Sequence, residues 1–122
     1  MKAVIGITDW EQTKQELLDL GRRADAGEDL PEADYHLGFP DAAHLLSELP
    51  PRRLDTLRAI KSLGPVSVYA VAKSLARNYS NIHTDVQKLL EHGLVEKTED
   101  GRIYMPWEDV VVRVNASLLK AA

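Results

Sequence analysis

The stretch from residue 65 to residue 107 constrains the fold more than any other part of the chain. Two helix-length runs, YAVAKSLA and YSNIHTDVQKLLEH, stand on either side of the short break Arg77-Asn78, and a glycine follows the second run. Two strand-like runs come next, joined by Asp100-Gly101, the dipeptide that most favours a tight hairpin because glycine takes positive φ without steric cost. The pattern predicts a helix, a turn, a second helix and a two-stranded hairpin, in that order.

This order is the layout of a winged helix-turn-helix, in which the second helix enters the major groove of DNA and the hairpin is the wing. Apolar side chains recur at helical spacing through residues 79–92 and predict a buried stripe. They are Tyr79, Ile82, Val86, Leu89 and Leu90. The opposite face carries short hydrogen-bonding side chains near the start of the helix, where base edges would be reached.

The contacts to DNA are predicted from the chemistry of these side chains. Asn and Gln can pair bidentately with adenine, Ser and Thr can donate or accept, and cations hold the phosphate backbone. The predicted base-reading residues are Ser80, Asn81, His83, Thr84 and Gln87. The predicted backbone contacts are Lys73, Arg77, Tyr79, Lys88, Lys97 and Arg102.

Each of these assignments has a structural alternative. Any amphipathic helix has a polar outer face, and polar residues at its start often serve only as caps, with Asn78 the expected cap here. His83 lies at the edge of the stripe, where packing against a neighbour is the other interpretation. Asp85 would repel phosphate if it pointed outward, so we expect it to pair with a basic side chain such as Arg77.

The charge is unevenly distributed along the chain. The net charge is −4, but residues 1–50 hold four Lys/Arg against eleven Asp/Glu, a balance of −7, and residues 51–122 hold eleven against eight, a balance of +3. A basic surface recruits phosphate, so local sign matters more than the total. The division favours a mildly basic DNA reader with an acidic N-terminal attachment, although small helical proteins often show such unevenness.

Composition narrows the class of protein further. The chain has no cysteine, which excludes disulfides, thiolate zinc sites and cysteine nucleophiles. It has no long apolar run, so we expect no membrane span. Its start, MKAVIGITDWEQ, lacks the apolar core of a signal peptide, and we expect a cytoplasmic location.

The N-terminal residues 1–38 are predicted to form a strand-helix arm. Residues 2–8 are β-prone, and Asp9 is a plausible N-cap for a helix from Trp10 to about Arg23. The apolar side of that helix is predicted to carry Leu17, Leu18 and Leu20. The acidic residues 24–38 contain two glycines and a proline and predict an irregular linker.

The winged helix-turn-helix domain is predicted over residues 39–122, which makes the fold α+β and mostly helical. Pro40 fits the first turn of a short helix, and Pro50-Pro51 starts another that ends at Gly64-Pro65. Its apolar face carries Leu54, Leu57 and Ile60. Residues 110–114 favour a strand, and the β-prone runs at the two ends of the chain could pair within one chain or across a dimer.

The sequence resembles the MarR-like family of predicted prokaryotic winged-helix regulators, which includes antitoxin-type members. The resemblance covers residues 40–114 and is carried by NYSNIHTDV, LLEHGLVEK and PWEDVVVRV. Two positions depart from the pattern: Ala70 stands where a capping box has Glu, opposite the expected cap Ser67, and Ala76 stands where the turn commonly has glycine. The resemblance implies a cytoplasmic, homodimeric regulator, encoded beside a toxin that it controls.

We therefore expect a sequence-specific regulator of transcription that binds double-stranded DNA, as a repressor or autoregulator of its own operon. The alternative is an antitoxin-type protein-interaction module that neutralises a partner toxin through the N-terminal arm. We expect no enzyme, no cofactor and no metal, because the four histidines show no HExxH or triad-like spacing.

Overall fold

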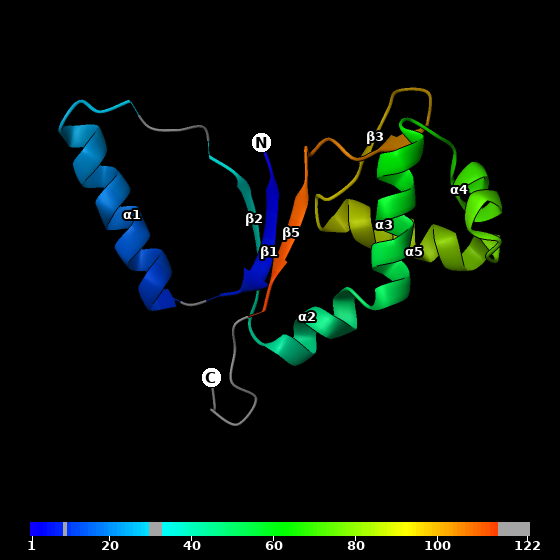
Figure 1. Ribbon diagram of the computed structural model, residues 1–122, viewed down its shortest axis with the longest axis horizontal. Coiled ribbons are helices and arrows are strands. Elements are labelled where there is room, and N and C mark those ends of the chain that lie inside the picture. The colour runs from blue at the N-terminus through cyan, green and yellow to red at the C-terminus, as the bar shows by residue number, and fades with distance from the viewer. Residues whose placement is uncertain (9, 30–32, 115–122) are drawn as a thin grey trace. The chain divides into compact units, whose positions relative to one another are not determined.

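The computed structural model describes residues 1–8, 10–29 and 33–114 of the chain. Within these ranges the protein is α+β, with five helices and two small sheets (Figure 1). The contacts divide the chain into two compact units. The first contains Met1–Leu45 and the chain from Asp109 onward, and the second contains Leu46–Glu108.

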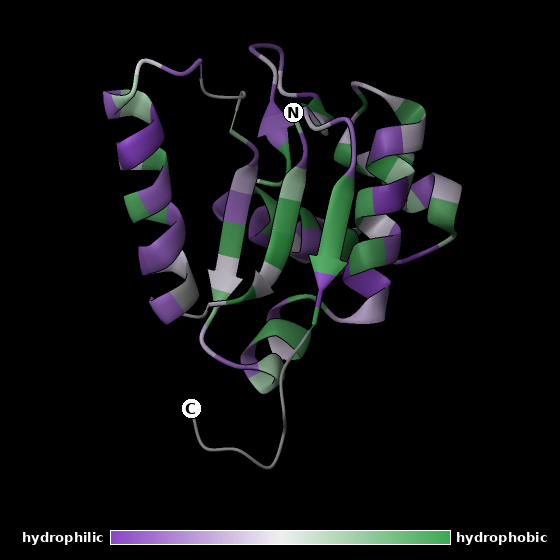
Figure 2. Ribbon diagram, turned by 60° about the vertical axis from the view of Figure 1, so that its left-hand side comes forward, coloured by the Kyte–Doolittle hydropathy of each residue, from purple (hydrophilic) through white to green (hydrophobic). Residues whose placement is uncertain are grey.

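A parallel three-stranded sheet forms the centre of the first unit, in the order β2-β1-β5. Its strands are β1 (Ala3–Ile7), β2 (Tyr35–Phe39) and β5 (Val110–Arg113). Helix α1 (Trp10–Asp25) connects β1 with β2, because two parallel strands cannot be joined by a tight hairpin. Strand β5 is almost wholly hydrophobic, as is typical of parallel strands (Figure 2).

Strand β2 shows that the prediction of an irregular linker over residues 24–38 was wrong at its C-terminal end. Tyr35 to Phe39 pair with Ala3 to Ile7 in register, and the Thr8 amide donates to the Phe39 carbonyl over 2.8 Å. A Cβ at position 38 would overlap the Thr8 hydroxyl, so the glycine permits the close approach of these two segments of the chain. The strand depends on β1, a partner more than 30 residues away, which local composition does not show.

The pairing of β5 with β1 answers a question that the sequence left open. Val110 lies opposite Ala3 in a parallel register, and the Ala3 amide donates to the Asp109 carbonyl over 3.0 Å. The two β-prone ends therefore pair within one chain. Residues 109–114 belong to the same unit as the N-terminal residues, whereas the sequence placed them with residues 39–108.

Helix α1 confirms the helix predicted from Trp10 to about Arg23 and continues to Asp25. The predicted cap Asp9 and residues 30–32 of the acidic segment lie outside the described residues. The leucines that were expected on its apolar side are exposed: Leu17 by 59%, Leu18 by 52% and Leu20 by 39%. The described part of the chain therefore leaves this stripe uncovered.

The second unit packs three helices and a hairpin around one core. These elements are α3 (Pro51–Leu63), α4 (Val68–Leu75), α5 (Tyr79–Glu91), β3 (Glu96–Lys97) and β4 (Ile103–Tyr104). Each of the three helices and β4 contributes at least one fully buried side chain, including Ile60, Val71, Ile82, Leu89 and Ile103. Leu57 and Ile60 of the face predicted for α3 are buried, and Leu54 is half-buried.

Local signals set the ends of these helices as the sequence predicts. Ser67 accepts from the Ala70 amide at 3.1 Å at the start of α4, and Asn78 accepts from the Ser80 amide at 2.8 Å at the start of α5. Gly64 ends α3 with φ of 72°. Ala76, between α4 and α5, has φ of 52° and ψ of 42°, a left-handed conformation that glycine adopts more easily.

Helix α2 (Ala42–Glu48) begins two residues later than expected. The sequence placed Pro40 in its first turn, but the Asp41 carboxylate accepts a hydrogen bond from the His44 amide at 2.7 Å. Asp41 is therefore the N-cap, and Pro40 precedes the helix.

The hairpin forms at the predicted Asp100-Gly101 turn, where Gly101 has φ of 86°. Glu96 pairs with Tyr104 and Lys97 with Ile103 in an antiparallel register. Val66, just before α4, also exchanges two backbone hydrogen bonds with Ile103, at 3.0 and 2.8 Å. The hairpin is thereby joined to the entrance of α4.

Candidate nucleic-acid interface

The outer face of α5 presents the residues that were predicted to read bases. Their side chains are all exposed: Ser80, Asn81, His83, Thr84 and Gln87. The inner face buries Ile82, Val86 and Leu89 almost completely, and Leu90 is half-buried. The helix therefore separates a hydrogen-bonding face from a core face along its whole length.

Tyr79 does not belong to the buried stripe in which the sequence placed it. Its side chain is 51% exposed, and its ring lies 6.0 Å from the ring of His83, tilted by 33°. Tyr79 is the first residue of α5, so the core that α3 and α4 provide does not cover it. The exposed position leaves it on the same side as the predicted contacts, and His83 packs against it.

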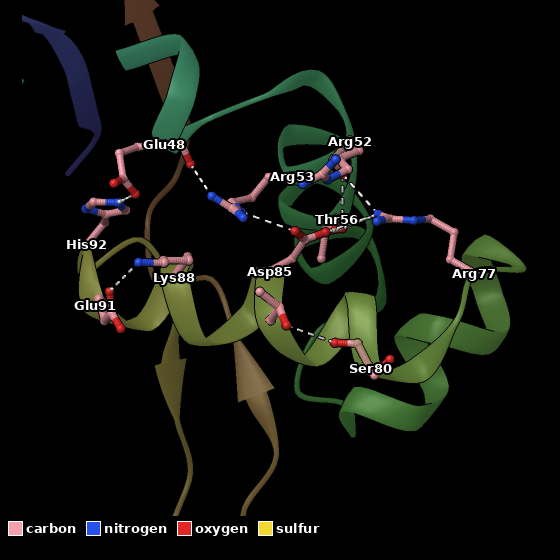
Figure 3. A network of polar contacts seen from close by, with 11 residues as sticks. Glu48, Arg52, Arg53, Thr56, Arg77, Ser80, Asp85, Lys88, Glu91 and His92 are labelled. Carbon is pink, nitrogen blue, oxygen red and sulfur yellow. Dashed lines mark hydrogen bonds and ion pairs between the residues drawn. The ribbon is translucent and has the colours of Figure 1, made fainter. Parts of the chain in front are cut away.

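Beneath the exposed face, a buried carboxylate ties α5 to α3 and to the turn (Figure 3). Asp85 is 1% exposed and accepts from Arg53 Nε at 3.1 Å, from the Thr56 hydroxyl at 2.9 Å and from Arg77 Nη1 at 3.1 Å. The predicted pairing of Asp85 with Arg77 is confirmed. The contributions of Arg53 and Thr56 were not predicted, because these residues come from a helix that lies about 30 positions earlier in the chain.

The arginines that bind Asp85 also donate hydrogen bonds to backbone carbonyls. Arg53 Nη1 donates to the Glu48 carbonyl at 2.6 Å, and Arg77 Nη1 also donates to the Arg52 carbonyl at 3.2 Å. No side-chain polar atom that is buried among the described residues lacks a hydrogen-bond partner. A fully satisfied buried network of this kind fixes geometry, since any displacement would leave a charge unpaired.

The basic side chains that were predicted to contact the DNA backbone have different surroundings. Arg77 is mostly occupied by the network, with 24% of its side chain exposed. Lys73 on α4 and Lys97 on β3 are exposed, whereas Lys88 lies 3.5 Å from Glu91 on the same helix. Arg102 forms an ion pair at 2.9 Å with Asp100 at the tip of the hairpin, so its charge is partly neutralised.

Hydrogen bonds within the hairpin also shift two pKa values. The Thr98 hydroxyl donates to the Asp100 carboxylate, and Arg102 adds an opposite charge, so that the pKa of Asp100 lies below its ordinary value. The Tyr104 hydroxyl donates to Glu96 at 2.7 Å, which raises the pKa of the phenol. Both bonds bridge positions on the hairpin and stiffen it.

One feature of the site was not predicted. A hollow of about 170 Å³ lies between the start of α3 and the face of α5. Its lining residues are Arg52, Arg77, Asn81, Thr84 and Asp85. The sequence did contain a signal for it, the Arg52-Arg53 pair that follows two prolines. Neighbouring positions on a helix diverge by about 100°, so the two arginines cannot both point inward.

A family model named HVO_A0114 matches residues 48–112. The chain belongs to the HVO_A0114 family. The matched span includes α3, α4, α5, the hairpin and most of β5, so the whole candidate interface lies inside it. Comparisons of this HVO_A0114 chain with curated proteins and with solved structures found no match.

Within residues 1–8, 10–29 and 33–114, no three His, Asp or Glu side chains come together in a way that could hold a metal ion. Over the same residues, no helix combines the length and the apolar character that crossing a membrane requires.

Proposed function

We propose that this chain is a sequence-specific, double-stranded DNA-binding regulator of transcription, built on a winged helix-turn-helix. It represses its own operon by occupying a promoter in the cytoplasm. The observation that carries the proposal is the exposed hydrogen-bonding face of α5, which stands over a network that holds the helix in place. Helix α4 and the turn precede this face, and a hairpin suited to be the wing follows it.

The division of labour follows from the positions of the side chains. Asn81 and Thr84 lie on the exposed N-terminal half of α5, so they read base edges. Lys73 on α4 supplies a positive charge that contacts the phosphate backbone of the DNA. The wing contributes little, because Asp100 already neutralises Arg102 and Glu99 adds negative charge at the tip.

The test is fluorescence anisotropy of labelled DNA from upstream of the chain's own gene, against a scrambled duplex, over a series of salt concentrations. Asn81→Ala and Thr84→Ala are expected to lose about 1–3 kcal/mol of binding to the specific duplex only. Lys73→Ala weakens both duplexes and lowers the salt slope by about 0.9. Arg58→Ala, on the exposed side of α3 beside Asp55, is the control and changes neither.

Equal binding of the wild-type chain to both duplexes at every salt concentration would contradict sequence-specific reading. Identical behaviour of the Asn81 and Lys73 variants would contradict the division of roles. Within the described residues the Thr84 hydroxyl donates only to the Ser80 carbonyl of its own helix, so its removal leaves the fold intact and the result interpretable.

The exposed leucines of α1 favour a second copy of this chain as the partner of the arm. Acidic Glu11 stands in the first turn of α1 and basic Arg22 and Arg23 in its last turn, so antiparallel pairing of two such helices brings opposite charges together. Leu17 and Leu20 would then pack in the seam between them. A dimer would present two copies of α5 to a palindromic site with half-sites about 34–36 Å apart.

Light scattering over a concentration series tests the dimer. The double variant Leu17→Ser and Leu20→Ser is expected to be monomeric where the wild type is dimeric. Leu46→Ser is the matched control, since Leu46 on α2 is exposed by the same 59% as Leu17. A wild-type chain that is monomeric at all concentrations would overturn self-association and leave the stripe to a different protein, as in the antitoxin alternative.

A further inference from the structure

The hollow beside α5 is bounded by two arginines from different elements. Arg52 is the second residue of α3, and Arg77 follows α4 in the turn. Figure 3 shows the Arg77 side chain reaching across to Arg52 and Thr56. Asn81 and Thr84, two of the predicted base-reading residues, form the wall on the α5 side.

The charge of this hollow is positive after its internal pairs are counted. Among the described residues that line it, Asp85 is the only acidic one, and it is matched by Arg53 and Arg77 together. Arg52 makes no ion pair with the described residues, and its side chain is exposed. Arg77 uses only Nη1 for its hydrogen bonds to the described residues, which leaves Nε and Nη2 as donors.

The size of the hollow selects among anions. Sites for drug-sized ligands begin at about 300 Å³, and this one is smaller, at about 170 Å³. A single tetrahedral oxyanion matches the donors, which are guanidinium groups from two sides. A bulky organic effector does not match the volume.

We propose that this hollow binds one phosphate group, with Arg52 as its principal ligand and Arg77 as a further donor. In the complex the phosphate is a DNA backbone phosphate that flanks the bases read by α5. This assignment rests on the proposed function. The same chemistry could also hold free inorganic phosphate, and the experiments below separate the two sources.

The first experiment uses no DNA. Inorganic phosphate is titrated into the wild-type chain at constant ionic strength, and amide and arginine side-chain signals are followed by NMR. The Asn81 and Thr84 amides and Arg77 Nε are expected to shift saturably. Arg52→Ala weakens this response about tenfold or abolishes it, as expected when one charged hydrogen-bond partner is lost. Arg58→Ala on the same helix leaves it unchanged.

Arg52→Ala is suited to the test because it spares the fold. The network uses only the backbone carbonyl of Arg52, which accepts from Thr56 and Arg77 and is retained in alanine. Arg52→Glu reverses the charge at the same place and should abolish the phosphate response altogether. An unchanged response in both variants overturns the site.

The second experiment measures binding to DNA against salt. Arg52→Ala is expected to lower the slope of log K against log[salt] by about 0.9 and to weaken specific and scrambled duplexes by the same factor, whereas Arg58→Ala does neither. If phosphate shifts depend on Arg52 but the salt slope does not change, the site takes free phosphate and not the backbone. If the wild type binds no DNA, the proposed function fails while the phosphate titration still decides the hollow.

Discussion

Helices α1 and α5 carry similar patterns and have opposite surroundings. Each repeats apolar residues at helical spacing and has a polar opposite face. In α5 the core of its unit buries Ile82, Val86 and Leu89 to within 1%, whereas Leu17 and Leu18 of α1 are more than half exposed. Periodicity thus identifies a helix and its apolar side, but what covers that side depends on elements elsewhere in the chain or in another molecule.

The largest expected difference between the two helices lies in their carboxylates. Asp85→Ala in α5 is expected to lower the free energy of unfolding by about 3–5 kcal/mol, because it leaves the buried Arg53 without its counter-charge. Asp19→Ala, an exposed position of α1, should change stability by less than about 0.5 kcal/mol. Urea denaturation followed by circular dichroism measures both. A loss of stability in Asp85→Ala as small as that in Asp19→Ala would mean that the network around Asp85 does not stabilise the fold.

The next largest difference is expected between leucines of the two helices when each is truncated to alanine. Leu89→Ala in α5 should destabilise the chain by about 2–5 kcal/mol through lost burial and a core cavity. Leu17→Ala in α1 should stay within about 0.5 kcal/mol when measured at a concentration where the chain is monomeric. A large effect at Leu17 in the monomer would show that the helix packs on its own unit in solution, and this would count against the paired α1 helices proposed above.

The turns that end α1 and α4 sharpen the comparison at a smaller scale. The chain leaves α1 through Gly27, with φ of 79°, but leaves α4 through Ala76, with φ of 52°. Gly27→Ala is expected to cost about 1 kcal/mol, and Ala76→Gly to stabilise the chain by about 0.5 kcal/mol, because alanine is strained in the left-handed region. Thermal denaturation should show a lower melting temperature for Gly27→Ala and a higher one for Ala76→Gly. Destabilisation by Ala76→Gly would refute strain at this turn.

The smallest expected effect is a pH dependence confined to the hairpin. The pKa of Asp100 is lowered from its ordinary value of 3.8 by the Thr98 hydroxyl and by Arg102. Because the folded pKa is the lower one, the stabilisation is present above 3.8 and is lost as the pH falls through the folded value. The protection of the hairpin amides, expressed as their exchange relative to the intrinsic rate at each pH, should fall in the wild type as the pH drops below 5. This fall should be absent in Asp100→Asn.

Local signals explain why much of the second unit could be predicted. Caps such as Ser67 and Asn78 act within three residues of their own position, and the hairpin turn needs only the dipeptide Asp100-Gly101. The exposed side of α5 follows from helical periodicity in the same way. Tyr79 was misplaced because periodicity continues to the end of a helix, whereas the core that covers the helix does not.

Features that depend on distant residues could not be predicted. Residues 35–39 become a strand because β1 offers hydrogen bonds to them, and nothing local distinguishes them from a loop. Arg53 reaches Asp85 from 32 positions away, and Arg52 meets the face of α5 only after α3 and α5 have packed.

The sequence by itself determined the helix-turn-helix order, the hairpin and the polar face of α5, because propensity, capping and periodicity act over a few residues. The tertiary structure alone decided the parallel sheet that joins both ends of the described chain, the partners of Asp85 and the hollow lined by Arg52. Backbone pairing, the burial of charge and the shape of a cavity arise only when segments far apart in the sequence are brought into contact.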